Sequence, residues 1–439
     1  MSLSTLESRI NNKTAKIAIV GLGYVGLPVA ALLADKGFSV LGAEIKADRV
    51  NLINQGISPI EGKEPGLSEM IKRVIESGNL HATVNFADLA DRDLILVNVE
   101  TPVNDDNYPE YKALRAAVSS VGKNMRTGAL VIIESTIMPT TMEKIVLPLL
   151  QEISGKQVGK DFYLGNCPER VMPGKLLSNL ADLSRVVGGD TPQTAVVMKL
   201  FYKHIVDADI DETDWITAEL VKTTENAYRD VQIAFANEVA MICEELGADV
   251  WRVRELVRKS PGREMLMPGA GVGGHCIPKD PWLLVSSVRD SNLPLKLIPT
   301  GREINTSMPS HMLALLKEKT GDIRGKKVLL LGFAYLQESD DIRNSPAKVL
   351  ANLLKSEGAQ VVIHDPFVSE FMGDVYQTAR DCDAAMLVTA HSEYASMDFA
   401  RLKDQMREPV IIDGRNLLDR EMLAAAGIDL VTLGFKRKS

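Results

Sequence analysis

The sequence predicts an α/β protein with two doubly wound domains joined by a long central helix. Short apolar runs alternate with stretches of helical spacing, which is the pattern of a parallel sheet covered by helices. Residues 213–247 contain no glycine or proline before Gly247, and their apolar residues recur at three- and four-residue steps. The segment KIAIVGLGY at 16–24 is echoed by KVLLLGFAY at 327–335, so the second half restarts the architecture of the first.

The first domain is expected to cover residues 1–205. Residues 15–20, AKIAIV, predict a buried strand, and glycine punctuation followed by helical spacing predicts a turn and a helix up to Gly37. Four later apolar runs predict further strands: FSVLGAE, DLILVNV, ALVIIES and DFYLGN. Their alternation with helical segments predicts a parallel sheet with helices on both faces.

A central helical domain is expected over residues 206–315 and a second α/β domain over 316–439. The central domain contains the long helix and a further helical stretch, DVWRVRELVRK. The long helix either packs against a second copy of the chain or merely bridges two domains of one subunit. In the last domain, the runs AQVVIHD, AAMLVT and PVIIDGRN predict strands.

Composition places the chain among ordinary globular proteins. Of its 439 residues, 45% are hydrophobic and 25% charged, and the net charge is −8, which argues against a non-specific nucleic-acid binder or a surface held to anionic lipid. No run approaches the roughly 20 apolar residues of a membrane span. The first residues, MSLSTLESRINNKTAK, lack the apolar core of a signal peptide, so a cytoplasmic protein is expected.

The four cysteines are widely separated and show no metal-ligand or disulfide spacing. Cys167, Cys243, Cys276 and Cys382 form no CxxC pair, so no structural metal site and no disulfide framework is expected. Cys276 stands out because it lies within GVGGHCIPKD, between a run of glycines and a Lys-Asp pair. Its two interpretations are a small buried residue after a turn and a reactive thiol.

A glycine-rich turn in the first repeat predicts a dinucleotide site. Gly21, Gly23 and Gly26 form G-x-G-x-x-G after a strand and at the start of a helix, where a pyrophosphate can meet the helix N-terminus. Glu44 ends the next strand, where a carboxylate can accept hydrogen bonds from ribose hydroxyls and disfavour the extra phosphate of NADP. A tight turn without a ligand is the alternative. The motif indicates a Rossmann-like first domain that binds NAD, and the second repeat is not equivalent because it lacks the third glycine.

Polar side chains end the later strands of the first domain, at the sheet edge where ligands lie. Thr101 follows one strand, and Glu134, Ser135 and Thr136 follow the next, where hydroxyl groups either contact a ligand or cap helices. Glu169 in NCPERVMPG could order a water or the substrate, and a surface ion pair is the alternative.

Two polar residues on the long helix share one face. Lys222 and Asn226 are four residues apart, so both could address one reacting oxygen, the lysine as a cation and the asparagine as a hydrogen-bond donor. The alternative for a helical lysine is a solvated charge.

Several motifs together resemble the UDP-glucose/GDP-mannose 6-dehydrogenase family. They are GLGYVGLP, STIMPTT, PERVMPG, ELVKTTENAYRD, GVGGHCIPKDPWLL, DDIRNSPA and DGRN, in the family's order and over nearly the whole chain. The forms GGHCIP and PERVMPG resemble the UDP-N-acetylhexosamine branch of that family. The resemblance implies a three-domain homodimer or higher homo-oligomer that uses NAD to oxidise a UDP-sugar C6 alcohol to a carboxylate, with two hydride transfers, for surface polysaccharide biosynthesis.

The resemblance also implies roles for individual residues. Cys276 would hold the half-oxidised sugar as a thiohemiacetal and then a thioester, Asp280 would help water to release it, and Lys222 would stabilise oxyanions. Asn226, Thr136 and Glu169 complete the implied catalytic set. The implied cofactor contacts are Gly21, Gly23, Tyr24, Val25, Gly26, Glu44, Arg49, Thr101, Ser135, Thr136, Lys279 and Arg343. The implied substrate contacts are Glu169, Arg170, Val171, Lys222, Asn226, Arg263, Gly271, Val272, Gly273, Gly274, His275 and Arg415.

Two positions depart from the family pattern, and they leave the sugar open. Leu336 stands where the family usually has a lysine, and Glu100 where it usually has proline or glycine. DPWLL favours UDP-N-acetylmannosamine, with UDP-N-acetylglucosamine next, by resemblance alone. The alternatives are a UDP-glucose 6-dehydrogenase, a catalytically silent nucleotide-sugar binding protein and a two-electron alcohol dehydrogenase. A Cys276–His275 dyad is disfavoured because adjacent side chains usually point apart.

Overall fold

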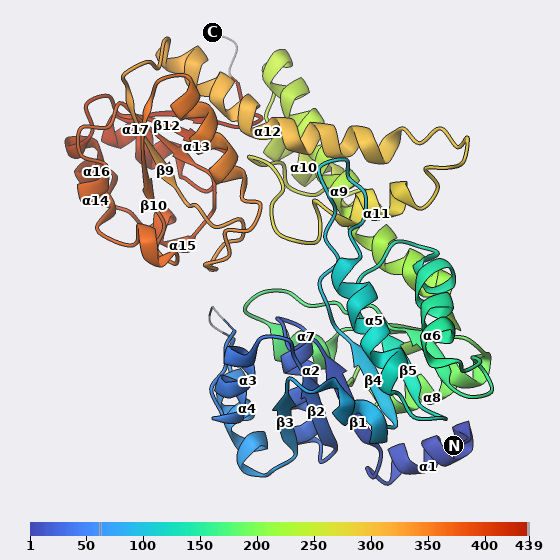
Figure 1. The fold of residues 1–439 in the computed structure, drawn as a ribbon. Helices are drawn as coiled ribbons and strands as arrows, with labels where there is room; N and C mark the ends of the chain where they lie inside the picture. The colour runs from blue at the N-terminus through green and yellow to red at the C-terminus, as the bar shows by residue number, and fades with distance from the viewer. Residues whose placement is uncertain (61, 63, 437–439) are drawn as a thin grey trace. The chain divides into compact units, whose positions relative to one another are not determined.

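The chain divides into two units, shown together in Figure 1. The computed structural model describes residues 1–60, 62 and 64–436. The N-terminal unit comprises residues 1–225 and 282–292, and the C-terminal unit comprises residues 226–281 and 293–439. Each unit has its own sheet, as the internal repeat in the sequence predicts.

The N-terminal unit is built on an eight-stranded sheet in the order β3-β2-β1-β4-β5-β6-β7-β8. The strands are β1 (Lys16–Val20), β2 (Ser39–Ala43), β3 (Leu80–Thr83), β4 (Leu94–Val97), β5 (Leu130–Ile133), β6 (Tyr163–Asn166), β7 (Arg185–Gly189) and β8 (Ile210–Asp214). The predicted parallel arrangement holds except between β6 and β7, which pair antiparallel. The segment between β6 and β7 joins them at the same end of the sheet, so the chain reverses direction. Antiparallel neighbours of this kind need no connection that crosses to the other end of the sheet.

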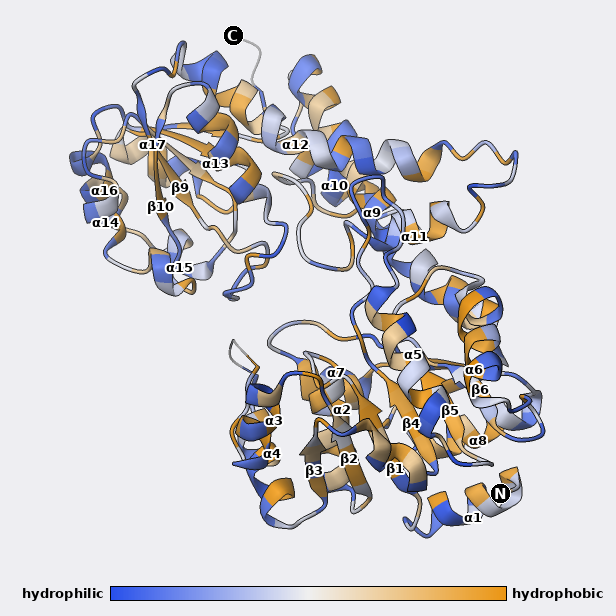
Figure 2. Ribbon diagram, viewed as in Figure 1, coloured by the Kyte–Doolittle hydropathy of each residue, from blue (hydrophilic) through white to orange (hydrophobic). Residues whose placement is uncertain are grey.

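Two apolar layers cover this sheet, one on each face. Ile17 and Ile19 of β1 lie in one core cluster, whereas Ala18 and Val20 lie in the other, because successive side chains of a strand point to opposite faces. Figure 2 shows the strands in orange and much of the helix surface in blue. The helices are α1 (Leu3–Asn11), α2 (Gly26–Asp35), α3 (Ala47–Asn54), α4 (Leu67–Glu76), α5 (Lys112–Asn124), α6 (Leu147–Ser154), α7 (Leu176–Asp182) and α8 (Pro192–Tyr202), with a 3₁₀ segment at Phe86–Asp91 and a π turn at Met142–Val146.

The predicted long helix is present as α9 (Trp215–Leu246), which begins in the N-terminal unit and continues into the C-terminal one. The stretch DVWRVRELVRK contains the predicted helix as α10 (Val250–Val257), with Asp249 as its N-cap. Two further helices follow, α11 (Asp280–Ser286) and α12 (Leu297–Thr320). In the part of the chain that the structure describes, no helix has the length and apolar character needed to cross a membrane.

The C-terminal unit repeats the doubly wound pattern with a five-stranded parallel sheet in the order β10-β9-β11-β12-β13. Its strands are β9 (Lys327–Leu331), β10 (Gln360–His364), β11 (Ala384–Leu387), β12 (Val410–Asp413) and β13 (Asp429–Thr432). Lys16 of β1 pairs with the first residue of β2, and Lys327 of β9 pairs with the first residue of β10, so the two repeats share their register. The helices are α13 (Pro346–Ser356), α14 (Val375–Thr378), α15 (Ser392–Ala395), α16 (Phe399–Gln405) and α17 (Arg420–Ala426), with a 3₁₀ turn at Ser369–Phe371.

Candidate active site

The glycine turn after β1 has the geometry of a phosphate-binding loop. Gly21 has φ +90°, and a Cβ there would lie 2.5 Å from the carbonyl oxygen of Asn98. A Cβ on Gly26 would lie 2.0 Å from the carbonyl oxygen of Gly21, so α2 packs tightly on the turn. A Cβ on Gly23 would meet nothing within 4 Å, which leaves its backbone open to a ligand at the N-terminus of α2. These three environments match the three roles predicted for the motif and fit the pyrophosphate of NAD.

Glu44 lies directly after β2 and is the residue predicted to bind the ribose hydroxyls. Its Oε2 accepts from the Leu22 N–H at 3.0 Å, and its Oε1 accepts from the N–H groups of Ile45 and Lys46 at 2.9 and 3.1 Å. Arg49 donates from Nη2 to the Leu22 carbonyl at 3.1 Å. The carboxylate is therefore fixed against the glycine turn.

Two further cofactor candidates, Tyr24 and Val25, flank the start of α2. The Tyr24 hydroxyl donates to Glu64, and Val25 is the N-cap residue of the helix. Both residues are thus part of the same turn region as the glycines.

The hydroxyl groups after β4 and β5 join two loops at the carboxyl edge of the sheet. Thr101 Oγ1 donates to the Thr136 carbonyl at 2.6 Å, and Ser135 Oγ donates to the Val99 carbonyl at 2.7 Å. Ser135 also accepts from the Val99 N–H at 3.0 Å, so it ties the two strand ends together and does not act as a helix cap. Thr136 itself is half-buried.

A buried group of ionisable side chains lies next to these loops. Glu134 Oε1 accepts from the Tyr202 hydroxyl at 2.5 Å, and its Oε2 accepts from Asn98 Nδ2 at 2.6 Å. Glu169 pairs with Arg185 at 2.8 Å, and both side chains are almost fully buried. The ion pair considered for Glu169 therefore exists, but it lies in the interior instead of on the surface.

Burial controls the protonation of this group. Burial and the charge of Glu169 raise the pKa of Glu134 to about 7, against the opposing effects of Arg185 and its two hydrogen bonds. Burial likewise raises the pKa of Glu169, although the charges of Arg185, Lys222 and Arg170 oppose the rise. Carboxyl groups that can hold a proton near neutral pH are suited to proton transfer.

The other residues predicted in this unit occupy defined positions. Arg170 donates from Nε to Glu225 Oε2 at 2.9 Å, and Val171 packs against the nearby core cluster. Lys222 is 9% exposed and lowers the pKa of Glu169, so the solvated-charge interpretation of this lysine is wrong. Glu100, one of the two departures from the family pattern, is exposed.

Cys276 lies on an exposed turn in the C-terminal unit, whereas the other three cysteines are buried. Its carbonyl accepts from the N–H groups of Lys279 and Asp280 at 3.0 and 2.8 Å, which closes the turn at the start of α11. The interpretation as a small buried residue is therefore wrong. The exposed turn is instead consistent with a reactive thiol.

Asp280 is fully buried behind this turn and is held by two predicted site residues. Asn226 Nδ2 of α9 donates to its Oδ2 at 2.6 Å, and Lys279 Nζ lies 3.2 Å from its Oδ1. The structure thus brings Asn226, Lys279 and Asp280 together behind the Cys276 turn.

The glycines before Cys276 let the chain pass close to a second loop. A Cβ on Gly273 would lie 2.6 Å from Tyr335 Cβ, and one on Gly274 would lie 2.8 Å from the Tyr335 ring. Gly271 has φ +129° and lies against Pro346. Val272 is half-buried between these glycines. Glycine is therefore required here by close packing and by backbone conformation.

His275 is half-buried beside the thiol. Burial and the charges of Lys279 and Arg343 lower the pKa of this histidine, against the opposing charges of Asp280 and Asp341. The lowered pKa favours the neutral imidazole at neutral pH.

Three arginines were predicted to bind substrate or cofactor from the C-terminal unit. Arg415 donates from Nε to the Val388 carbonyl at 2.8 Å and packs against Gly269. Arg343 pairs with Asp341 at 2.5 Å. Arg263 is exposed and lines a cavity of about 500 Å³ beside α9. Leu336, the other departure from the family pattern, is half-buried.

Three segments of the chain match the three domains of one family. Residues 15–206 match the NAD-binding domain, residues 216–307 the central domain and residues 329–420 the UDP-binding domain of the UDP-glucose/GDP-mannose dehydrogenase family. The chain belongs to this family. It is an NAD-dependent nucleotide-sugar dehydrogenase, and its substrate is a UDP-sugar.

Relatives in the family are similar over nearly their whole length. UDP-N-acetyl-D-mannosamine dehydrogenase of Pyrococcus horikoshii is 37% identical over 407 residues, which cover 92% of this chain and 96% of the relative. A solved structure described as the UDP-D-ManNAc dehydrogenase of that organism matches with a TM-score of 0.89 at 36% identity, over 95% of this chain and 99% of the other. The NDP-N-acetyl-D-galactosaminuronic acid dehydrogenase of Methanosarcina mazei matches with a TM-score of 0.87 at 34% identity, over 99% and 98%.

Several residues of the site were missed by sequence reasoning. Arg185 and Tyr202 complete the buried group around Glu134 and Glu169. The sequence pattern around each predicts a strand or an amphipathic helix and gives no indication of a functional site. The available signal was Arg185 at the head of the apolar run RVVGG. Among the residues described, no cluster of three or more His, Cys, Asp or Glu side chains has the arrangement of a metal site.

Proposed function

We propose that this chain oxidises the C6 hydroxyl of UDP-N-acetylmannosamine to a carboxylate, using two NAD⁺ per sugar and Cys276 as covalent nucleophile. The observation that carries the proposal is the exposed Cys276 turn backed by buried Asp280, which Asn226 and Lys279 hold in place. The similarity to the UDP-N-acetyl-D-mannosamine dehydrogenase of P. horikoshii supports the choice of sugar.

The proposed reaction has four steps, which are an oxidation, the addition of the thiolate, a second oxidation and a hydrolysis. Loss of a hydride from C6 and a proton from its hydroxyl gives an aldehyde. The Cys276 thiolate then adds to C6, and the resulting alkoxide takes up a proton to form a thiohemiacetal. Loss of a second hydride and the hydroxyl proton gives a thioester. Water attacks the thioester, the C–S bond breaks, and the uronic acid and the free thiol are released. NAD⁺ held by the glycine turn after β1 would supply the hydride acceptor for each oxidation.

The protein side chains supply charge and proton handling in this scheme. Lys222 stabilises the oxyanions formed at C6, because water screens the charge of a buried cation only weakly and its attraction for developing negative charge is strong. Asp280 accepts a proton from the attacking water, and Asn226 and Thr136 orient the water and the hydroxyl group. The charge of Lys222 acts on buried Glu169 and opposes the rise of its pKa. This electrostatic interaction supports a role for Glu169 in the same proton transfers.

The remaining contacts are assigned by position in the two units. NAD is bound by the glycine turn after β1 and by the loops after β4 and β5. The residues of these segments are Tyr24, Val25, Glu44, Arg49, Thr101, Ser135 and Thr136, and Lys279 and Arg343 make further contacts. The substrate contacts are Glu169, Arg170, Val171, Arg263, Gly271, Val272, Gly273, Gly274, His275 and Arg415. We retain the division into residues 1–205, 206–315 and 316–439 as part of this proposal.

The substrate is tested by following NADH absorbance with a panel of UDP-sugars. The panel comprises the manno, gluco and galacto N-acetylhexosamines and UDP-glucose. We expect the highest kcat/KM with UDP-N-acetylmannosamine and two NADH per sugar. One NADH per sugar would instead indicate a two-electron alcohol dehydrogenase, and a flat trace with every sugar but intact NAD binding would indicate a silent nucleotide-sugar binding protein.

The covalent role is tested with Cys276→Ser. The variant should bind NAD and the UDP-sugar with wild-type affinity, and it should lose turnover because an alkoxide is a poorer leaving group and a serine a weaker nucleophile. The buried Cys382→Ser is the matched control and should retain turnover. Normal turnover of Cys276→Ser would refute the thioester mechanism.

We also propose a homodimer built on α9. Tyr228, Phe235 and Ile242 are 63%, 58% and 50% exposed and recur every seven residues, which is the spacing of a helix that packs along another helix. Phe235 and Arg263 line the same cavity in the C-terminal unit. Light scattering should give a dimer for the wild type and a monomer for Phe235→Glu, and a wild-type monomer would refute the proposal.

The cellular site of the reaction is proposed to be the cytoplasm. The residues that the structure describes form no disulfide, which is usual in a reducing compartment. The proposed product is a nucleotide-linked uronic acid, which a glycosyltransferase for surface polysaccharide would consume.

A further inference from the structure

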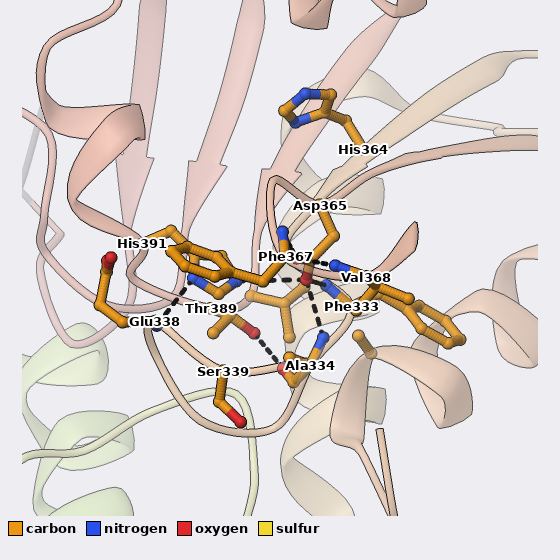
Figure 3. Close-up of polar contacts among 12 residues, drawn as sticks. Phe333, Ala334, Glu338, Ser339, His364, Asp365, Phe367, Val368, Thr389 and His391 are labelled. Atoms are coloured by element: carbon orange, nitrogen blue, oxygen red, sulfur yellow. Dashed lines mark hydrogen bonds and ion pairs between the residues drawn. The ribbon is translucent and has the colours of Figure 1, made fainter. Parts of the chain in front are cut away.

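Asp365 follows β10 in the second repeat, the position that Glu44 has after β2 in the first. Its Oδ2 accepts from the N–H groups of Phe333 and Ala334 at 2.6 and 2.9 Å, and its Oδ1 accepts from those of Phe367 and Val368 at 2.9 and 3.2 Å (Figure 3). Burial opposes ionisation, yet a hydrogen bond from His391 and three backbone N–H groups lower the pKa of this carboxyl to about 2. The side chain is therefore ionised, and it fixes the loop after β9 through these hydrogen bonds.

His391 joins this carboxylate to a later part of the same loop. Its Nε2 lies 3.1 Å from Asp365 Oδ2, and its Nδ1 lies 3.0 Å from the backbone nitrogen of Glu338. Because the backbone N–H can only donate, Nδ1 is the acceptor and Nε2 carries the ring proton. His391 and Asp365 have no exposed surface, and the ring stacks on Phe367 with centroids 5.0 Å apart.

The segment held by His391 has a constrained backbone. Glu338 has φ +56°, a conformation that a residue with a side chain adopts only when its surroundings enforce it. Its N–H is held by His391, and its Oε1 accepts from the Ser392 N–H at 2.7 Å. Asn344, later in the same loop, also has a positive φ of +48°.

This loop, residues 333–344, contacts the glycines directly before the reactive thiol. The Gly274 N–H donates to the Arg343 carbonyl at 2.9 Å, and Asn344 Nδ2 donates to the Gly274 carbonyl at 3.1 Å. Tyr335 covers Gly274 so closely that a Cβ there would lie 2.8 Å from the ring. Both backbone groups of Gly274, two residues before Cys276, are thus set by the loop that His391 and Asp365 hold.

We propose that His391 and Asp365 are positioning residues that place the Cys276 thiol by fixing the loop 333–344. Because neither side chain has exposed surface, both would act without contacting the substrate. They act through Phe333, Ala334 and Glu338 on the loop and through the loop on Gly274. The proposal rests on the covalent role of Cys276 proposed above. Because a misplacement of about 1 Å can cost about 100-fold in rate, such an indirect contact has a measurable kinetic effect.

The test compares His391 with its neighbouring buried histidine. His391→Phe removes both polar contacts, and His391→Gln keeps an amide that can donate to Asp365. His364→Phe is the matched control, because His364 is also buried but its side-chain hydrogen bonds go to Tyr394 and to the Gly373 carbonyl, neither of which belongs to the loop. Figure 3 shows its ring apart from the His391 contacts. NAD affinity and thermal unfolding establish that each variant is folded.

The readouts are kcat, KM for the UDP-sugar and the rate of Cys276 alkylation by iodoacetamide, mapped by peptide mass spectrometry. His391→Phe should lower kcat by about 10-fold or more and change the alkylation rate by about threefold or more, with partial rescue in His391→Gln. His364→Phe should lower stability and leave both rates within about twofold. Equal behaviour of His391→Phe and His364→Phe in all three readouts would overturn the proposal.

A second variant works from the exposed side of the loop and leaves the buried pair intact. Glu338→Pro removes the N–H that His391 accepts and forbids a positive φ, so it should reproduce the kinetic and alkylation changes. Wild-type rates in this variant would also overturn the proposal. If the wild type oxidises no UDP-sugar, the proposed function fails, whereas the alkylation comparison still decides the positioning role.

Discussion

Asn226 donates from Nδ2 to Oδ2 of Asp280 at 2.6 Å, so an amide of α9 fixes a carboxylate that has no exposed surface. Replacing Asn226 with alanine leaves this oxygen without its donor, which costs about 1–3 kcal/mol when the group is buried. We expect kcat to fall about 10- to 100-fold, mainly by slowing release of the thioester. Mass spectrometry of the quenched reaction should show the sugar accumulating on Cys276.

The control for this prediction is Thr224→Ala, at an exposed position of the same helix. It should turn over like the wild type. An Asn226→Ala variant with unchanged kcat would contradict a role for the Asn226–Asp280 contact in catalysis.

Alanine at two glycines of the first turn should affect different properties, NAD binding at Gly23 and stability at Gly26. Gly23→Ala meets nothing within 4 Å, so the protein should fold normally but bind NAD about 10-fold or more weakly, because the methyl group occupies the pyrophosphate position. Gly26→Ala would place its Cβ 2.0 Å from a backbone oxygen, so it should lose about 1–3 kcal/mol of unfolding free energy. Calorimetric titration with NAD and chemical denaturation separate the two effects. Equal NAD affinity of Gly23→Ala and wild type would argue against this turn as the phosphate site.

Glu134 should make stability fall as pH rises toward neutral. Burial and the charge of Glu169 raise its pKa to about 7 in the folded protein, so the folded state keeps a proton that the unfolded chain has already released. The folded state therefore binds more protons between the unfolded and folded pKa values, and its stability declines with increasing pH through that window. Glu134→Gln cannot ionise and also relieves the repulsion of Glu169.

This prediction is measured as the difference in melting temperature between Glu134→Gln and wild type from about pH 5 to pH 8. The difference should shift in favour of the variant as pH rises. Parallel curves over the whole range would show that Glu134 titrates outside this window.

The Arg185–Glu169 pair should contribute far more to stability than an exposed pair. Arg185→Met leaves a carboxylate buried without its cation, which typically costs about 3–5 kcal/mol. Arg73 pairs with Asp35 at 2.7 Å but is largely exposed, so Arg73→Gln should cost less than about 1 kcal/mol. Urea denaturation of both variants tests the comparison. Similar losses would mean that Glu169 is neutral in the folded protein at the pH of the experiment.

Much of the fold could be predicted because its elements repeat simple local patterns. The apolar run at 16–20 and the glycines after it are a strand and a turn, and the absence of helix breakers in 213–247 predicts α9. The strands β3, β7, β8 and β13 escaped prediction, and two of them, LHAT and IDETD, lack an apolar run. The reversal of β7 was also missed, since strand direction depends on the return path of the chain and not on the composition of the strand.

The sequence by itself determined the residue types of the site: three glycines at one turn, an acid after the second strand, and a cysteine in a glycine loop. Only the tertiary structure decided which of them are buried and what they contact. It brought Glu134 and Glu169 into one interior group, and it placed Asn226 on Asp280 across 54 positions of sequence. Desolvation and charge pairing depend on neighbours that are distant in the chain, so neither can be predicted from the local spacing of residues.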